Sequence, residues 1–340
     1  MCFELDKPEE YCIIFGDMLT KIKKEFERFK KKLPFFGKVY KELEKTQYKL
    51  NNLPYEIYDK IKNSNFTVPI PTIKTEDETL DKILQDKCSL SRFGDGEFGV
   101  MNGGHIHFQN RSVKLAQRLK EVIASDASNL LIGLPDCFGS LDNCVPSGAD
   151  FWRKWMSQKR EMAYSYLDMN RVYYNAFFSR IYMLFNKTEE HNKKCSEYFE
   201  KIKKIWAGRD VIICEGEGTR FGMFNDLLSS AKSISRILCP AVSAFDKYDE
   251  ILSAFNDIGK DKLVLIALGP TATVLAYDLC NKGYQAIDIG HLDLEYERFL
   301  TRGAPDIPLK FKYIDSTKEG RIIRPLDDPE YKSQIIKKII

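Results

Sequence analysis

From about residue 77 onward, short apolar runs alternate with stretches long enough to form helices, and this alternation constrains the fold most strongly. Strands that carry Val, Ile and Leu at nearly every position are typical of a parallel sheet buried on both faces. Strands connected by helices are typical of a doubly wound sheet. The sequence therefore predicts an α/β, Rossmann-like domain with a mainly parallel sheet. The apolar runs are residues 88–94, 129–134, 210–214, 233–238, 262–268 and 284–289, and the helical stretches include 111–124, 149–167 and 270–282.

Polar or glycine-rich segments follow most of the predicted strands. In a doubly wound sheet, ligands bind beyond the carboxyl ends of the strands. A sheet without a binding site would need only ordinary turn residues at these places. We therefore expect a functional site at this edge. The segments are residues 92–97, 135–136, 215–220, 269–273 and 290–297.

Asp95 and Glu97 lie two residues apart, directly after the first predicted strand. Side chains at this spacing can converge on a turning backbone, and Gly94 and Gly96 allow a ligand to approach closely. Two oxygen ligands suit Mn²⁺ or Mg²⁺, which usually share their coordination shell with substrate phosphates. The alternative is a polar turn that merely contains two acids. We expect Asp95 and Glu97 to hold a divalent cation, with Arg92, Gly94 and Gly96 beside the ligand.

A glycine-rich segment that ends at Arg220 follows the third predicted strand and precedes a run at 221–231 that we expect to be helical. A glycine turn at a helix N-terminus offers free N–H groups to an anion, and an arginine can hold a phosphate through two donors. Gly216, Gly218 and Arg220 are therefore candidate phosphate-binding residues. The segment is not a dinucleotide fingerprint, because Phe221 stands in place of the third glycine.

Gly269, Pro270 and Thr271 form a second strand-to-helix turn. Pro270 can occupy the first helical position, where its missing N–H costs little. The hydroxyl group of Thr271 or Thr273 could either cap the helix or donate to a phosphate. The sequence leaves both interpretations open.

His291, Asp293, Glu295 and Glu297 form the densest polar cluster at any predicted strand end. A carboxylate or an imidazole at this place could accept a proton from a hydroxyl group. The alternative is a helix start, at which acidic side chains complement the helix dipole. The residues alone do not separate these two roles.

Residues 21–49 hold eleven Lys and Arg but four Asp and Glu, a net charge of +7 within a chain of net charge +3. Apolar residues recur every three or four positions from Phe15 to Phe29, which predicts an amphipathic helix, and a second helical stretch continues to about Leu50. Residues 13–50 could contact an anionic membrane surface or a partner protein. The alternative is a solvated helical hairpin that packs on its own domain or on a second subunit of a homo-oligomer.

The chain thus divides into three expected parts. Residues 1–62 form a basic helical extension, residues 63–76 form a linker with two prolines and no periodicity, and residues 77–340 form the Rossmann-like domain.

The composition excludes several classes of protein. A net charge of +3 argues against a protein that coats nucleic acid. No apolar run reaches the roughly 18 residues that a spanning helix needs, and the N-terminus is acidic where a signal peptide would be basic. Nine scattered cysteines without a CxxC pair disfavour a zinc ribbon or a disulfide framework. We expect a cytoplasmic protein, at most peripheral to the inner face of the membrane.

Four segments carry a family resemblance: RFGDGE at 92–97, EGTR at 217–220, ALGPTATVLAYDL at 267–279 and DIGHLDLEYE at 288–297. Together they resemble the bacterial glycosyltransferases of the GT-D fold, which were first catalogued as a domain of unknown function and occur in protein-glycosylation and surface-polysaccharide loci. The resemblance spans about residues 77–305. The last two segments, in this order, are specific, whereas a short Asp-x-Glu motif alone would not be.

The resemblance implies a domain that binds a UDP-sugar with a divalent metal, commonly Mn²⁺, at Asp95 and Glu97. It also implies that Arg220 and the turn at 269–273 contact the nucleotide or its phosphates. Thr219 stands where the family has a serine in Gly-Ser-Arg, and it keeps a hydroxyl group.

The same resemblance implies that the segment from His291 to Glu297 faces the sugar and the acceptor. It does not settle which acid is the base. We favour Glu297 or Glu295, with Asp293 behind them.

We therefore expect a hexosyltransferase that moves a hexose, with glucose as the first expectation, from a UDP-sugar to a glycan on a protein or lipid carrier. We expect inversion at C1, because no separate enzyme nucleophile is evident. One alternative is a metal-dependent phosphohydrolase or nucleotidyltransferase on the same sheet. Another is a catalytically silent subunit that binds a nucleotide sugar within a glycosylation complex.

Overall fold

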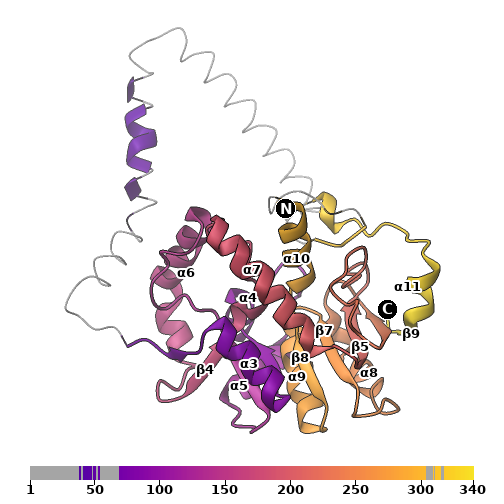
Figure 1. Ribbon diagram of the computed structural model, residues 1–340. Coiled ribbons are helices and arrows are strands. Elements are labelled where there is room, and N and C mark those ends of the chain that lie inside the picture. The colour runs from indigo at the N-terminus through magenta and orange to yellow at the C-terminus, as the bar shows by residue number, and fades with distance from the viewer. Residues whose placement is uncertain are drawn as a thin grey trace, which may run out of the picture. The chain divides into compact units, whose positions relative to one another are not determined.

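Figure 1 shows the computed structural model, which divides the chain into two units, residues 1–64 and 65–340. In the first unit, the described residues between 38 and 50 are helical and exposed, as expected for the stretch up to about Leu50. The expected amphipathic helix from Phe15 to Phe29 lies outside the described residues. The structure describes residues 38–39, 41–47, 49–50, 53, 69–303, 309, 311–314 and 318–340.

The second unit is built on one sheet in which every strand pair is parallel. Within the described part of the chain, nine strands follow the order β1-β4-β3-β2-β8-β7-β5-β6-β9, and Figure 1 shows β4 and β9 toward opposite ends of the sheet. The carboxyl ends of all these strands therefore lie along one edge. The strands are β1 Thr72–Ile73, β2 Ser89–Arg92, β3 Leu130–Leu134, β4 Val172–Asn175, β5 Asp210–Gly216, β6 Ser233–Cys239, β7 Leu263–Ala267, β8 Gln285–Asp288 and β9 Ile335–Lys338.

Local sequence signals account for where the main helices begin. Thr75 caps the first turn of α3 and forms a reciprocal capping box with Glu78. Ser112 caps α5, and Pro270 is the first residue of α9. The helices are α3 Glu76–Asp86, α4 Asp95–Met101, α5 Val113–Ala124, α6 Pro146–Tyr164, α7 Glu189–Ile202, α8 Tyr248–Ser253, α9 Pro270–Asn281, α10 Leu292–Thr301 and α11 Pro329–Gln334.

Helices cover both faces of the sheet, which confirms the doubly wound fold. On one face, α3, α7 and α10 share a buried cluster with strand residues such as Ile213 and Leu265. The alternate residues Ile212 and Val264 point to the other face and are equally buried. That face is covered by α9, which packs on β2, β7 and β8 and contacts α5. Strands buried on both sides explain why the apolar runs in the sequence are continuous.

The six strands predicted from apolar runs are confirmed as β2, β3, β5, β6, β7 and β8. The three strands that the sequence did not predict, β1, β4 and β9, lie at or near the sheet ends, where one face is less buried and the apolar signal is weaker. β1 and the start of α3 at Glu76 fall inside the segment expected to be a linker. The ordered domain therefore begins earlier than expected.

The run at 221–231 is not the expected helix but a succession of turns. Polar contacts stabilise this non-helical course: the Asn225 side chain accepts a hydrogen bond from Leu227 N, and Glu215 accepts one from Phe221 N. The predicted helix N-terminus after Arg220 is therefore wrong.

No helix among the described residues is both long and apolar enough to cross a membrane. The seven cysteines of the described part are free, and Cys214 and Cys239 are buried in the sheet, as the sequence indicated.

Candidate functional site

Arg92 joins the carboxyl ends of neighbouring strands. Its Nη2 lies 3.1 Å from Oδ1 of Asp288, its Nε donates to the Asp288 carbonyl oxygen at 2.9 Å, and its Nη1 donates to Ala176 O at 3.1 Å. Thr273 in α9 adds a hydrogen bond from its hydroxyl group to Arg92 O at 2.8 Å. Arg92 therefore lies at the expected edge, but its guanidinium binds protein groups from β8 and from the segment after β4.

Gly290 makes room for Arg92. Its φ is 51°, in the left-handed region, and a Cβ at this position would lie 1.8 Å from Arg92 Nη2. Only glycine combines this backbone conformation with this close approach. The glycine in the DIGH segment thus has a packing role that the sequence analysis did not assign.

The expected metal-binding acids lie in the first turn of α4. Glu97 Oε2 accepts a hydrogen bond from Gly94 N at 2.8 Å, and Asp95 is exposed. Desolvation raises the pKa of Asp95, although Arg180 opposes this shift. Desolvation, and then the charges of Asp288 and Asp95, raise the pKa of Glu97 to about 7. Gly94 and Gly96 adopt ordinary extended or helical backbone, so neither is needed for an unusual φ.

This pair of acids fits a divalent cation that shares its coordination shell with a substrate. Desolvation raises the pKa of both carboxyl groups, and the charges of Asp288 and Asp95 add to this for Glu97, so a bound cation would stabilise the charged forms. In the described ranges, no group of three His, Cys, Asp or Glu side chains is arranged to hold a metal. The protein would thus supply two carboxylates, and phosphate oxygens and water would complete the shell, as is common for Mg²⁺.

Arg180 is a site residue that the sequence analysis missed, because it follows the unpredicted strand β4 and the short 3₁₀ helix at Ala176–Ser179. Its side chain is 45% exposed, and its Nε lies 3.7 Å from Glu295 Oε1. Its charge acts on both Asp95 and His291. A half-exposed cation thus lies close to the candidate metal-binding acids.

His291 is exposed at the start of α10. Partial desolvation, together with the charges of Arg180 and Arg92, lowers the pKa of His291 below its usual value. The imidazole is therefore neutral near pH 7 and can donate or accept one hydrogen bond at each nitrogen.

The acids of α10 have separate partners. Glu295 is buried, and its Oε2 accepts hydrogen bonds from Tyr182 N at 3.0 Å and Met183 N at 2.7 Å. These bonds hold the segment beyond Arg180 against α10. Glu295 is thus brought near the cluster, but its contacts are those of a residue that anchors backbone.

Asp293 and Glu297 share one lysine and one asparagine. Lys312 Nζ lies 2.6 Å from Asp293 Oδ2 and 3.1 Å from Glu297 Oε1. Asn225 Nδ2 donates to Asp293 Oδ1 at 2.8 Å and to Glu297 Oε1 at 2.7 Å. Burial raises the pKa of Asp293, and Lys312 opposes that shift. Lys312 and Asn225 lie in irregular segments with no recognisable motif, so the sequence offered no signal for them.

The segment at 215–220 packs against protein rather than opening toward a ligand. The guanidinium of Arg220 donates to the carbonyl oxygens of Phe311 and Arg324. Gly218, with φ of 86°, accepts a hydrogen bond from Tyr313 N at 2.8 Å through its carbonyl oxygen. A Cβ at Gly216 would meet Ala241 Cα at 3.2 Å.

Two further observations argue against phosphate binding by the segment at 215–220. Thr219 N donates to Gly216 O within a turn, and the helix expected after Arg220 is absent. Glu215, from the same segment, forms a buried ion pair of 2.7 Å with Arg236. Phosphate binding by Gly216, Gly218, Thr219 and Arg220 thus stays a prediction, and the observed contacts are those of a scaffold.

The turn at 269–271 lies at the start of α9. Gly269 has φ of 54°, and a Cβ there would lie 2.4 Å from the Phe108 ring. Thr271 is fully buried, and no described residue forms a hydrogen bond with its Oγ1. Neither threonine caps α9, because Gly269 is the cap and Thr273 binds Arg92.

The structure therefore brings Arg92, Asp95, Glu97 and His291 together with Asp288 and Arg180 at the carboxyl ends of β2, β8 and β4. These features define a Rossmann-like α/β protein whose candidate ligand site lies at the carboxyl edge of a parallel sheet. A model of the family described as "Glycosyltransferase GT-D fold" matches residues 90–317, and the chain belongs to this family.

Two relatives are glycosyltransferases by name. The chain is 35% identical over 269 residues to "Glycosyltransferase GlyD" of Streptococcus pneumoniae serotype 4 (strain ATCC BAA-334 / TIGR4), covering 79% of this chain and 32% of that protein. It is 37% identical over 264 residues to "Probable glycosyl transferase Gly" of Streptococcus gordonii, covering 76% of this chain and 38% of that protein. The chain thus spans only about a third of the length of these relatives.

Solved structures of domain of unknown function 1792 share the fold. One, described as having "a distinct glycosyltransferase fold", is 33% identical with a TM-score of 0.74, and the match covers 85% of this chain and 100% of that chain. Another, described as "A New Glycosyltransferase (DUF1792) from Streptococcus sanguinis", is 32% identical with a TM-score of 0.74, and the match covers 80% of this chain and 100% of that chain.

Proposed function

We propose that the protein is a metal-dependent hexosyltransferase that uses a UDP-sugar, with glucose as the first candidate sugar. The acceptor is a glycan on a protein or on a lipid carrier. The observation that carries this proposal is the cluster at the strand ends, where Asp95 lies within the electrostatic reach of Arg180, and Glu97 within that of Asp95 and Asp288. Membership of the GT-D family supports the reaction class.

In this proposal, Asp95 and Glu97 hold a divalent cation, Mn²⁺ or Mg²⁺. When bound, such an ion neutralises the diphosphate and stabilises it as a leaving group. Arg180 has a half-exposed guanidinium that can donate to a phosphate oxygen, in contrast to Arg220, whose terminal nitrogens bind backbone carbonyls. We therefore assign the phosphate contact to Arg180.

We assign the general base to Glu297. Both oxygens of Asp293 accept hydrogen bonds, and Glu295 is occupied by two backbone amides and faces Arg180. Among the residues that the structure describes, the two side chains that bind Glu297 both use its Oε1. Of the carboxylate oxygens of these three acids, Oε2 of Glu297 is therefore the best placed to accept a proton from an acceptor hydroxyl group.

The transfer is a single displacement. The acceptor oxygen forms a bond to C1 of the sugar while the bond from C1 to the diphosphate oxygen breaks. The electron pair of that bond leaves with the diphosphate, and the acceptor proton passes to Glu297. Attack opposite the leaving group inverts the configuration at C1.

The test is an assay of the full chain with UDP-glucose, Mn²⁺ and a panel of oligosaccharide acceptors, with the product linkage read by NMR. Transfer with inversion supports the proposal, and retention at C1 contradicts the single displacement. Release of phosphate or nucleotide without transfer would favour the hydrolase alternative. Donor binding without turnover for any acceptor would favour a silent subunit.

We further propose a cytoplasmic location, with residues 13–50 as the segment that contacts a membrane surface or a partner.

A further inference from the structure

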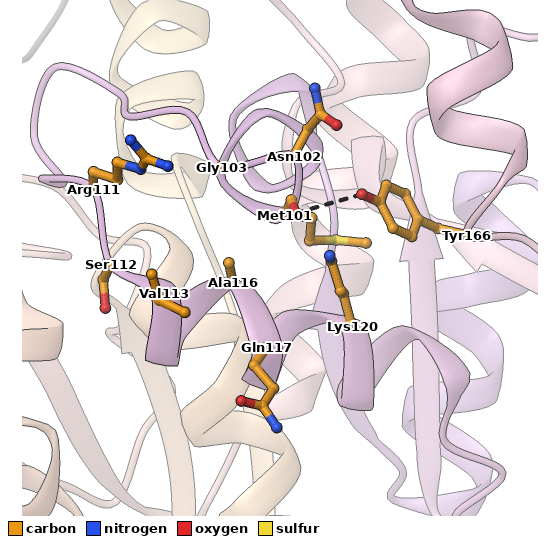
Figure 2. Close-up of a pocket in the computed structure, with 10 residues that line it drawn as sticks. All are labelled: Met101, Asn102, Gly103, Arg111, Ser112, Val113, Ala116, Gln117, Lys120 and Tyr166. Carbon is orange, nitrogen blue, oxygen red and sulfur yellow. Dashed lines mark hydrogen bonds between the residues drawn. The ribbon is translucent and has the colours of Figure 1, made fainter.

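A cavity lies at the end of α4 that is remote from Asp95 and Glu97. Its volume is about 400 Å³, and its walls come from Met101, the loop that follows, the first half of α5 and Tyr166 beyond α6. Figure 2 shows Arg111 at one end of the lining residues and the pair of Lys120 and Tyr166 at the other. This volume is within the range of sites that bind small molecules.

The cavity carries positive charge without compensation. Its lining contains Arg111 and Lys120 but no Asp or Glu. Neighbouring cations that do not line it are paired: Lys114 lies 3.5 Å from Asp249, and Arg118 lies 2.5 Å from Asp278. Within the described part of the chain, Arg111 and Lys120 have no carboxylate partner. Each of these cations would therefore attract an anionic group that enters the cavity.

The rest of the lining suits a sugar ring. Asn102 and Gln117 provide amide groups that can donate to and accept from hydroxyl groups. Val113, which is 76% exposed, and the ring of Tyr166 provide apolar surface for the C–H face of a sugar. Lys120 Nζ lies 5.4 Å from the centre of the Tyr166 ring, so the charge and the aromatic surface are adjacent.

We propose that this cavity binds an anionic sugar, a saccharide unit that carries a phosphate or a carboxylate. Lys120 binds the anionic group and the adjacent Tyr166 ring contacts the sugar ring, whereas Arg111 and Val113 line the other end of the cavity. This site is separate from the nucleotide site at the strand ends.

From the position of the cavity, we infer that the anionic sugar is one unit of the acceptor oligosaccharide. This inference rests on the function proposed above. Helix α4 carries Asp95 in its first turn and Met101 at its end. At a rise of about 1.5 Å per residue, these positions are about 9 Å apart along the helix. A short oligosaccharide can span this distance, with its reacting hydroxyl group at the strand ends and its anionic unit in the cavity.

The test measures binding by isothermal titration calorimetry, in EDTA, with the full chain carrying Asp95→Asn to suppress metal-linked binding at the strand ends. The probes are glucose 1-phosphate, glucuronate, neutral glucose and inorganic phosphate. We expect both anionic sugars to bind more tightly than glucose or phosphate, and the affinity to fall as salt is added. Lys120→Gln should weaken binding by about tenfold or more, Arg111→Gln at the other end should weaken it by less, and the matched control Lys114→Gln should leave it unchanged.

Three results would overturn the proposal: no binding of either anionic sugar, equal binding of inorganic phosphate alone, or an affinity that the Lys120 variant does not change. The result is independent of transfer activity. Binding as expected in a protein that transfers no sugar would support the cavity and contradict the function. Transfer activity without binding at the cavity would support the proposed function and contradict the proposal for the cavity.

Discussion

Arg92 Nη2 and Asp288 Oδ1 lie 3.1 Å apart and connect the ends of β2 and β8, two neighbouring strands that are 196 residues apart in the sequence. The candidate metal-binding acids follow Arg92 directly, and His291 follows Asp288 by three residues. This ion pair therefore fixes the two halves of the proposed site relative to each other. Loss of its geometry should affect both stability and activity.

Gly290→Ala tests this relationship. The added methyl group would have to displace the Arg92 guanidinium and would sit at a φ of 51°. We expect a loss of about 2 kcal/mol or more in the free energy of unfolding, with loss of transfer activity, measured by urea denaturation and by the transferase assay. Gly99→Ala is the matched control, because a Cβ at Gly99 in α4 meets nothing within 4 Å. Similar stability of the two variants would contradict the close packing.

Glu97→Gln tests the electrostatics of the metal-free site. Because the pKa of Glu97 rises from 4.5 to about 7 on folding, the folded protein binds this proton more tightly than the unfolded chain. The stabilisation it confers is present below pH 4.5 and is lost as the pH rises through about 7. Gln keeps an oxygen for Gly94 N but carries no charge. Between pH 5 and 8 in EDTA, the variant should lose less unfolding free energy than the wild type, by on the order of 2 kcal/mol. Parallel curves would show that Glu97 is not perturbed.

Arg180→Gln should lower activity toward the donor, whereas Arg220→Gln should lower the stability of the fold. Arg180 is half exposed, so its replacement should leave the melting temperature nearly unchanged while kcat/KM for the donor falls by about 10- to 100-fold. Arg220 is 5% exposed and binds two backbone carbonyls, so its replacement should lower the melting temperature. Thermal unfolding and donor kinetics of both variants decide the assignment. If Arg220→Gln lost activity while remaining as stable as the wild type, the phosphate contact would belong to Arg220.

Lys312→Met should destabilise the protein through Asp293 and Glu297. Lys312 is buried, and its removal leaves both carboxylates without their cation. Breaking such a pair typically costs about 3–5 kcal/mol. The loss should be larger at pH 8 than at pH 5, because burial raises the pKa of Asp293 and its protonated form needs no cation. Chemical denaturation at both pH values measures it.

The control for Lys312→Met is Lys232→Met, which breaks the exposed ion pair with Asp210 and should stay close to the wild type. Equal effects at the buried and exposed pairs would contradict the proposed role of Lys312.

Residues that follow strong strands were predictable from the sequence, and residues brought in by irregular segments were not. Asp95, Glu97 and His291 could be placed because the segments 88–94 and 284–289 were predicted as strands, now β2 and β8, and parallel strands share one carboxyl edge. Arg180 was missed because β4 lies near the end of the sheet and its sequence, VYYN, lacks a continuous aliphatic run.

The segment at 215–220 shows why a glycine-rich turn is a weak signal. Gly218 has a positive φ and is closely approached by other atoms, but those atoms belong to Tyr313 and Ile323 rather than to a ligand. The sequence could not indicate which surface the turn would face, because that surface comes from a segment about a hundred residues further along the chain.

The most direct test of the central claim is the binding of UDP-glucose to the full chain with and without Mn²⁺, measured by isothermal titration calorimetry. Asp95→Asn is the test variant, and Asp126→Asn, an exposed acid before β3 at the opposite edge of the sheet, is the control. We expect Mn²⁺ to strengthen binding in the wild type and in Asp126→Asn, and to have no effect in Asp95→Asn. Equal Mn²⁺ enhancement in all three proteins would contradict a cation held at Asp95.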